Sequence, residues 1–122
     1  MGMDRAIRFP SVPTTTWGAI RARLLQVGEA GTLRMIDGQP AFPDETPDPS
    51  WNELRVGLSA GMVTIRRTPD ALRCVVWGNA DAELLVAWDK LTWACAAGGV
   101  VETTSGALSA DEFAAATGLQ PA

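Results

Sequence analysis

The most regular feature of the chain is an alternation in which every second residue is apolar, found in three successive stretches: residues 53–59, 62–67 and 72–77. A period of two is typical of strands that bury one face. Short turn-forming segments separate the stretches, one of them with Pro69 at the first corner position. The pattern predicts a three-strand antiparallel meander. Its buried face would hold Leu54, Val56, Leu58, Val63, Ile65, Leu72, Cys74 and Val76, and its solvent face Arg55, Thr64, Arg66 and Arg73.

Two segments, residues 16–27 and 80–97, show the spacing of amphipathic helices instead. Asn79 is suited to cap the second helix, and Ser109 with Glu112 forms a capping box that starts a short third one. The apolar stripes consist of Trp17, Ile20, Leu24 and Val27 in the first segment and Leu84, Trp88, Leu91 and Cys95 in the second.

The remaining segments predict short strands and one long loop. Asp37-Gly38 indicates a hairpin turn, and Pro40 restricts the returning arm to a sheet edge. Residues 43–50, PDETPDPS, contain three prolines and three acidic residues and are interpreted as a surface loop. Further strands are expected at residues 5–9, 32–36 and 100–104.

Together these elements predict a single α+β domain over residues 1–122. We expect a two-layer sandwich in which an antiparallel sheet of four to six strands is covered on one face by the helix at about 80–97 and by the N-terminal helix. The length suits one hydrophobic core.

Composition restricts the partners. The 122 residues carry a net charge of −4 and a pI of about 4.6, so nucleic acid is not expected, because proteins that bind phosphates normally present a basic face. Apolar runs fall short of the ~20 residues needed to span a bilayer. Charged residues near the N-terminus argue against a signal peptide. We therefore expect a soluble cytoplasmic protein with no membrane attachment.

The available residue types exclude several kinds of catalysis. The sequence contains no histidine and no tyrosine, and Lys90 is its only lysine. Ser-His-Asp and Cys-His mechanisms and histidine-based zinc sites are therefore impossible within the chain. Cys74 and Cys95 are interpreted as small buried hydrophobes. Asp89 and Glu102 are the carboxylates nearest apolar surroundings, but their spacing does not tie them together. These absences favour a non-catalytic protein and leave carboxylates as the groups available for acid–base chemistry, and we expect no cofactor.

Two segments are candidates for ion binding. WGNADAEL, residues 77–84, places Gly-Asn between a strand and a helix start, where anion sites often lie. Asp81 in the first helical turn would repel a phosphate, so a plain helix cap is the preferred interpretation. The acidic loop of Asp44, Glu45 and Asp48 lacks the spacing of an EF-hand and is interpreted as solvated, without metal.

The tryptophans are candidates for a partner surface. Trp17 and Trp88 fall on helix stripes and are expected in the core. Trp51, Trp77 and Trp93 are harder to bury, and two of them exposed together would suit a protein partner or a flat ligand. The alternatives are that a helix covers them or that Trp93 lies at a homodimer seam.

Arg55, Arg66 and Arg73 form a second candidate surface on the solvent face of the meander. Guanidinium groups in a row could bind a carboxylate or a phosphate. The alternative is a solvated row with cross-strand partners such as Glu53.

These observations favour a non-catalytic protein-interaction module, such as a homodimer, an adaptor, or an inhibitor or immunity-type protein. The alternative is a protein that binds a small anionic molecule, or an enzyme using arginine and carboxylates, in a pocket between sheet and helices. A pocket joining Arg66 or Arg73 to a tryptophan would favour the alternative. A flat apolar patch around Trp51 or Trp93 would favour the interaction module.

Overall fold

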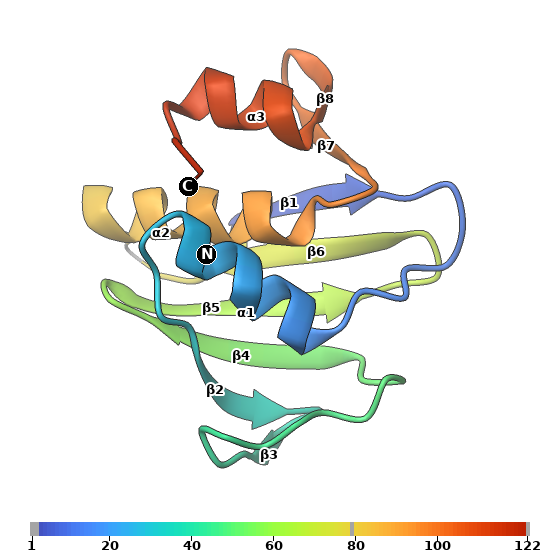
Figure 1. The fold of residues 1–122 in the computed structure, drawn as a ribbon, viewed down its shortest axis with the longest axis vertical. Helices are drawn as coiled ribbons and strands as arrows, with labels where there is room; N and C mark the ends of the chain where they lie inside the picture. The colour runs from blue at the N-terminus through green and yellow to red at the C-terminus, as the bar shows by residue number, and fades with distance from the viewer. Residues whose placement is uncertain (1–2, 79, 122) are drawn as a thin grey trace.

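The computed structural model describes residues 3–78 and 80–121 as one eight-stranded antiparallel sheet with three helices on the same face (Figure 1). The strands lie in the order β3-β2-β4-β5-β6-β1-β7-β8. Helix α2 lies between α1 and α3 in the helical layer, against β5, β6 and β1. The strands are β1 Met3–Arg8, β2 Thr32–Ile36, β3 Gln39–Pro40, β4 Glu53–Leu58, β5 Gly61–Arg67, β6 Ala71–Val76, β7 Val100–Thr103 and β8 Gly106–Ser109; the helices are α1 Trp17–Gln26, α2 Ala82–Cys95 and α3 Ala110–Thr117.

The α+β class is confirmed, but the predicted four to six strands are too few. The meander of β4, β5 and β6 is present in the expected register, with Val56 opposite Val63 and Ile65 opposite Cys74. The sheet extends beyond it because β1 adds to β6, and β7 and β8 continue from β1. Strand β8 was missed because its four residues lie between a turn and the cap of α3 and do not alternate.

The solvent face of the meander differs from the prediction at one position. Thr64 is only 3% exposed although no described helix covers this face. Thr64 lies opposite Val75, and the guanidinium of Arg66 reaches across this pair to within 5.3 Å of the Trp77 ring centre. The long side chains of the face therefore cover its central positions.

Two of the three helix starts follow the prediction. Thr16 caps α1, and Ser109 and Glu112 form the complete capping box of α3. Helix α2 begins at Ala82 with Asp81 as its N-cap, whose carboxylate accepts a hydrogen bond from the Leu84 N–H at 2.8 Å. The predicted cap, Asn79, lies outside the described residues. A carboxylate at this position also complements the helix dipole.

Strand β1 packs closely against the segment that follows α2. The connection from α2 to β7 passes so close that a Cβ atom on Gly99 would lie 2.7 Å from the Arg8 carbonyl oxygen. Only glycine permits that approach.

No helix within residues 3–78 and 80–121 has the length and apolar character needed to cross a bilayer.

Candidate functional site

The sheet splits between β1 and β7. Strand β1 pairs with β6 along its whole length, but with β7 only at Ile7 and Arg8, which lie opposite Val101 and Val100. Strand β7 continues to Thr103 in pairing with β8. Figure 1 shows the β7–β8 hairpin leaving the line of β1 beyond this point. The result is a gap within the sheet, bordered by Met3–Ala6 on one side and the hairpin on the other.

A cleft of about 790 Å³ occupies this gap. Asp4, Arg5 and Ala6 line it from β1, and the Glu102–Ser105 segment lines it from the hairpin. Its apolar lining from the helices and β8 consists of Trp88, Leu108, Phe113 and Ala116. The volume lies within the roughly 300–1,000 Å³ typical of ligand pockets.

Arg5 is the central cation of the cleft and was not identified from the sequence. Its side chain lies on the helix-covered face, since Arg5 is opposite the inward-facing Cys74. The guanidinium lies 3.8 Å from the Trp88 ring centre and 5.3 Å from that of Phe113, and it forms an ion pair with Asp89. The Trp88 indole is itself fixed by donating a hydrogen bond to the Cys74 carbonyl at 2.9 Å.

The backbone of β1 presents hydrogen-bonding groups to the cleft. Along a strand, the N–H and C=O groups of successive residues point to opposite sides. The Phe9 N–H donates to the Asp70 carbonyl on the β6 side, so Arg5 and Ile7 also point toward β6. Asp4 and Ala6 therefore point toward β7; the N–H and C=O of Asp4 and the N–H of Ala6 face no described strand, whereas the Ala6 C=O lies beside the Glu102 N–H next to the Ile7–Val101 pair.

The charges around the cleft are balanced. Arg73 lies 3.4 Å from Asp4, and Arg8 binds Glu102 at 2.6 Å. The hydrogen bond to Glu102 is the main reason that the pKa of Arg8 is raised. With Arg5 paired to Asp89, each cation bordering the cleft has a carboxylate partner. The two carboxylates singled out from the sequence, Asp89 and Glu102, thus belong to one site.

Two of the candidate surface tryptophans are buried, which corrects the expectation that they are hard to cover. Trp51 and Trp93 are only 1% and 3% exposed. The guanidinium of Arg67 lies 4.1 Å from the Trp51 ring centre, and that of Arg23 lies 3.9 Å from the Trp93 ring centre. Burial lowers the pKa of both arginines. Neither tryptophan offers a surface to a partner in the folded protein, and Trp93 cannot form a homodimer seam.

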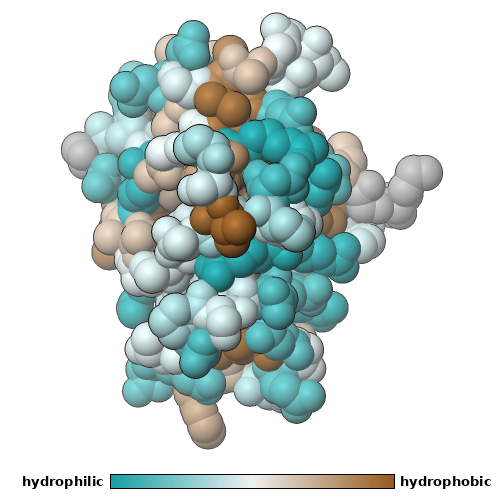
Figure 2. All heavy atoms as spheres, turned by 90° about the vertical axis from the view of Figure 1, so that its right-hand side faces the viewer, coloured by the Kyte–Doolittle hydropathy of each residue, from teal (hydrophilic) through white to brown (hydrophobic). Residues whose placement is uncertain are grey.

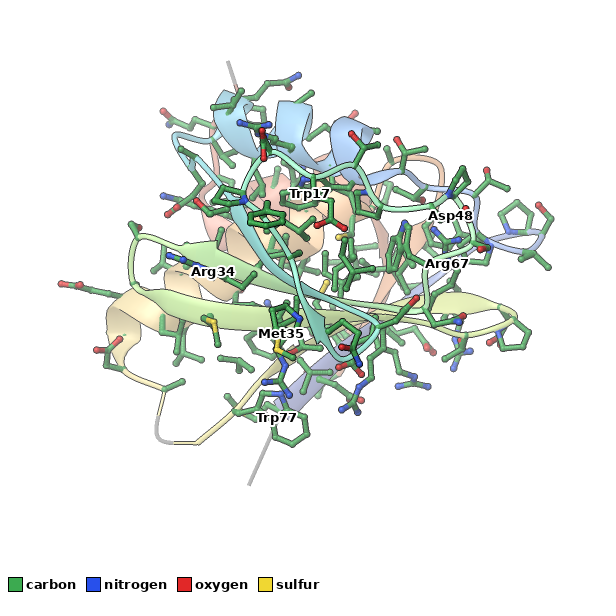
Figure 3. All side chains as sticks on the ribbon, turned by 90° about the horizontal axis from the view of Figure 1, so that it is seen from below. Trp17, Arg34, Met35, Asp48, Arg67 and Trp77 are labelled. Carbon is green, nitrogen blue, oxygen red and sulfur yellow. The ribbon has the colours of Figure 1, made fainter. Side chains whose placement is uncertain are left out.

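These two arginines also join distant segments. Arg67 donates to the carbonyls of Pro49 and Thr15, both at 2.7 Å, and so attaches the acidic loop and the start of α1 to the sheet (Figure 3). Arg23 donates to the Trp93 carbonyl at 3.1 Å near the end of α2. Their role is structural.

Trp77 is the exposed member of the candidate set, with 51% of its surface accessible. Figure 3 shows its ring on the side of the sheet opposite the helices. A hollow of about 220 Å³ lies beside it, lined by Met3, Asp4, Arg66, Val75 and Trp77. Arg55 and Arg66 lie on this outer face as predicted, while Arg73 reaches the border of the cleft.

Other polar groups do not assemble into a site. Glu29 is buried and accepts a hydrogen bond from the Ser59 hydroxyl at 2.8 Å, and Lys90 lies 3.6 Å from it. This cluster joins the end of α1, the β4–β5 turn and α2. In the described part of the chain, no group of His, Cys, Asp and Glu residues could hold a metal ion.

The view in Figure 2 shows the end of the molecule at the right of Figure 1. Hydrophobic residues form small separate spots there among hydrophilic ones. A hollow of about 360 Å³ under the β1–α1 connection has no charged side chain in its described lining. The cleft between β1 and β7 is therefore the stronger candidate for a binding site.

No family model, curated protein or solved structure matches this chain.

Proposed function

We propose that the protein is a non-catalytic interaction module that binds an extended segment of another polypeptide in the cleft between β1 and β7. The observation that carries the proposal is the split in the sheet, because the cleft lies between two strands of one sheet. An extended segment placed there would pair with an existing strand, a common mode of peptide recognition.

The length of the open edge sets the length of the segment. Met3–Ala6 pairs with β6 but not with β7, so a partner strand of about four residues, about 13 Å long, would match it. The N–H groups of Asp4 and Ala6 would supply the main-chain donors and the C=O of Asp4 the acceptor. Main-chain pairing gives affinity, and the side-chain environment gives specificity.

The side chains around the cleft define the sequence of the partner. Successive residues of a strand point to opposite faces, so one set would face Trp88, Leu108 and Phe113, and the other would face Arg73 and Asp4. The first set should be apolar and the second polar. Because the cations are already paired, a highly charged partner is not favoured.

A small organic anion is a second candidate, favoured by one observation. The cleft joins Arg73 and Arg5 to Trp88, which is the arrangement expected of a pocket for an anionic ligand with an aromatic or apolar body. Arg5 uses Nη1 for Asp89, and its Nε and Nη2 donate to no described residue. The strand edges make the peptide the better fit.

Filling the cleft tests the proposal. Peptides that bind the wild type are first selected from a random library displayed on phage. Their affinities are then measured for the wild type and for two variants. Ala116→Trp places an indole in the cleft, whereas Ala115→Trp alters the adjacent exposed residue of α3, which does not line it. We expect Ala116→Trp to weaken binding at least tenfold and Ala115→Trp to leave it unchanged. Peptides that bind all three proteins equally would contradict the proposal, and organic anions that alone respond to Ala116→Trp would favour the second candidate.

A further inference from the structure

The outer face of the sheet carries an exposed apolar group at one end. Trp77 directly follows β6, and Met62 on β5 and Met3 on β1 are also large exposed apolar residues. Thr64 of β5 pairs with Val75 of β6. Because the strands are antiparallel, the same register places Met62, two residues before Thr64, opposite Trp77, two residues after Val75. Trp77, on the face without helices (Figure 3), therefore lies beside Met62, whereas Met3 is opposite the inward-facing Val76 and points to the helix-covered face.

The same group contains both a projection and a recess. The Trp77 ring projects from the sheet, and the hollow of about 220 Å³ lies directly beside it. Val75 gives the hollow an apolar side, and Arg66 gives it a cation. An indole suits such a recess because it stacks under a guanidinium and buries its rings against apolar atoms.

The charges around the hollow are also mixed in sign. Arg66 donates to Glu53 at 3.1 Å, and Arg73 lies near Asp4. Arg66 and Arg73 face each other on adjacent strands, an arrangement of like charges that is unfavourable on its own. A second surface with the same mixture, turned by a two-fold axis, could place its carboxylates against these arginines.

We propose that the outer face binds a second copy of this chain about a two-fold axis, with Trp77 of each copy entering the hollow of the other. A two-fold interface is made of one patch used twice, so it requires a patch that is complementary to itself. A projection beside a matching recess, with cations beside carboxylates, meets this requirement. The inference goes beyond peptide binding, since the cleft opens at the β7 side of β1.

The size of the patch predicts a weak dimer. Strands β4, β5, β6 and β1 have six to seven residues each, which gives a face of about 19 by 20 Å, or ~400 Å² in projection. Stable interfaces bury about 600–1,000 Å² per partner, so a patch of ~400 Å² is below that range. We expect a dimer that dissociates on dilution in the micromolar range.

Sedimentation velocity over a concentration series tests this proposal. Trp77→Ala should weaken the dimer at least tenfold, and Met62→Glu, which adds a charge beside the hollow, should do the same. Phe42→Ala is the matched control, because Phe42 is 75% exposed but lies in the loop after β3. A wild type that stays monomeric at every concentration would overturn the proposal, as would a dimer that tolerates both changes at the face. Circular dichroism confirms that each variant is folded.

Discussion

The guanidinium carbon of Arg5 lies over the indole of Trp88, 3.8 Å from its ring centre, and this contact joins β1 to α2 at the cleft. Asp89, the next residue of α2, forms the ion pair that completes the arrangement. The cleft thus has a fixed wall where the sheet meets the helical layer.

Replacement of Arg5 should destabilise the protein. Arg5→Ala removes the stacking on Trp88 and leaves Asp89 without its partner, and we expect a loss of about 1–2 kcal/mol because both groups are only partly buried. Urea unfolding of Arg5→Ala, Asp89→Ala and the double variant measures the coupling. Strictly additive losses would mean that the ion pair contributes nothing.

Proline substitutions test the direction of the β1 backbone. The Ala6 N–H points to the cleft and the Arg5 N–H points to β6, so Ala6→Pro should cost less stability than Arg5→Pro, which removes a ladder hydrogen bond and leaves a β6 carbonyl unpaired at a cost of about 1–3 kcal/mol. Thermal unfolding compares the two, with Arg5→Ala as the correction for the lost side chain. Equal losses would contradict the assigned direction.

The thiol of Cys95 should make stability fall in alkaline solution. Contact with Cys74, followed by burial, raises the pKa of Cys95 well above its ordinary value of 9.0. The unfolded chain therefore loses the Cys95 proton at a lower pH than the folded chain does. The contribution of this thiol to stability is complete below pH 9.0 and is lost as the pH rises toward the pKa of the folded state.

The composition makes this effect measurable. The chain has no tyrosine and one lysine, so few other groups titrate between pH 9 and 10.5. The free energy of unfolding of the wild type should decline across this range more steeply than that of Cys95→Ala. Parallel slopes would show that the thiol is not responsible. Both thiols should also react with alkylating reagents only after unfolding, since both are buried.

Tryptophan fluorescence should separate Trp77 from the other four. Trp77 is half exposed, whereas Trp17, Trp51, Trp88 and Trp93 are buried. Iodide should quench one minor component of the emission, and Trp77→Phe should remove it. A quenchable component that persists in this variant would mean that another indole is exposed.

The elements with a strong local pattern were predictable. Residues 53–76 alternate over three strands, and the helix stripes of Trp17 and Trp88 fall on the buried faces of α1 and α2. The position of β1 was not predictable, because its pairing with β6 and β7 joins segments more than 60 residues apart in sequence. The split in the sheet depends on that pairing.

The candidate site was predictable only in part. Arg5 was not singled out from the sequence, since a charge at an inward strand position is unusual and its partners come from α2. The one available signal was its parity with Ile7, two residues along the same strand. The burial of Trp51 and Trp93 could not be decided from the sequence, because the arginines that cover them, Arg67 and Arg23, belong to other elements.

The most direct test of strand insertion follows the backbone amides of β1 by NMR while a selected peptide is added. The amides of Asp4 and Ala6 point into the cleft, whereas those of Arg5 and Ile7 are directed toward β6. We predict that the Asp4 and Ala6 amides shift and gain protection from hydrogen exchange, while the Arg5 and Ile7 amides, already paired, change little. Binding that leaves Asp4 and Ala6 unprotected would contradict the account.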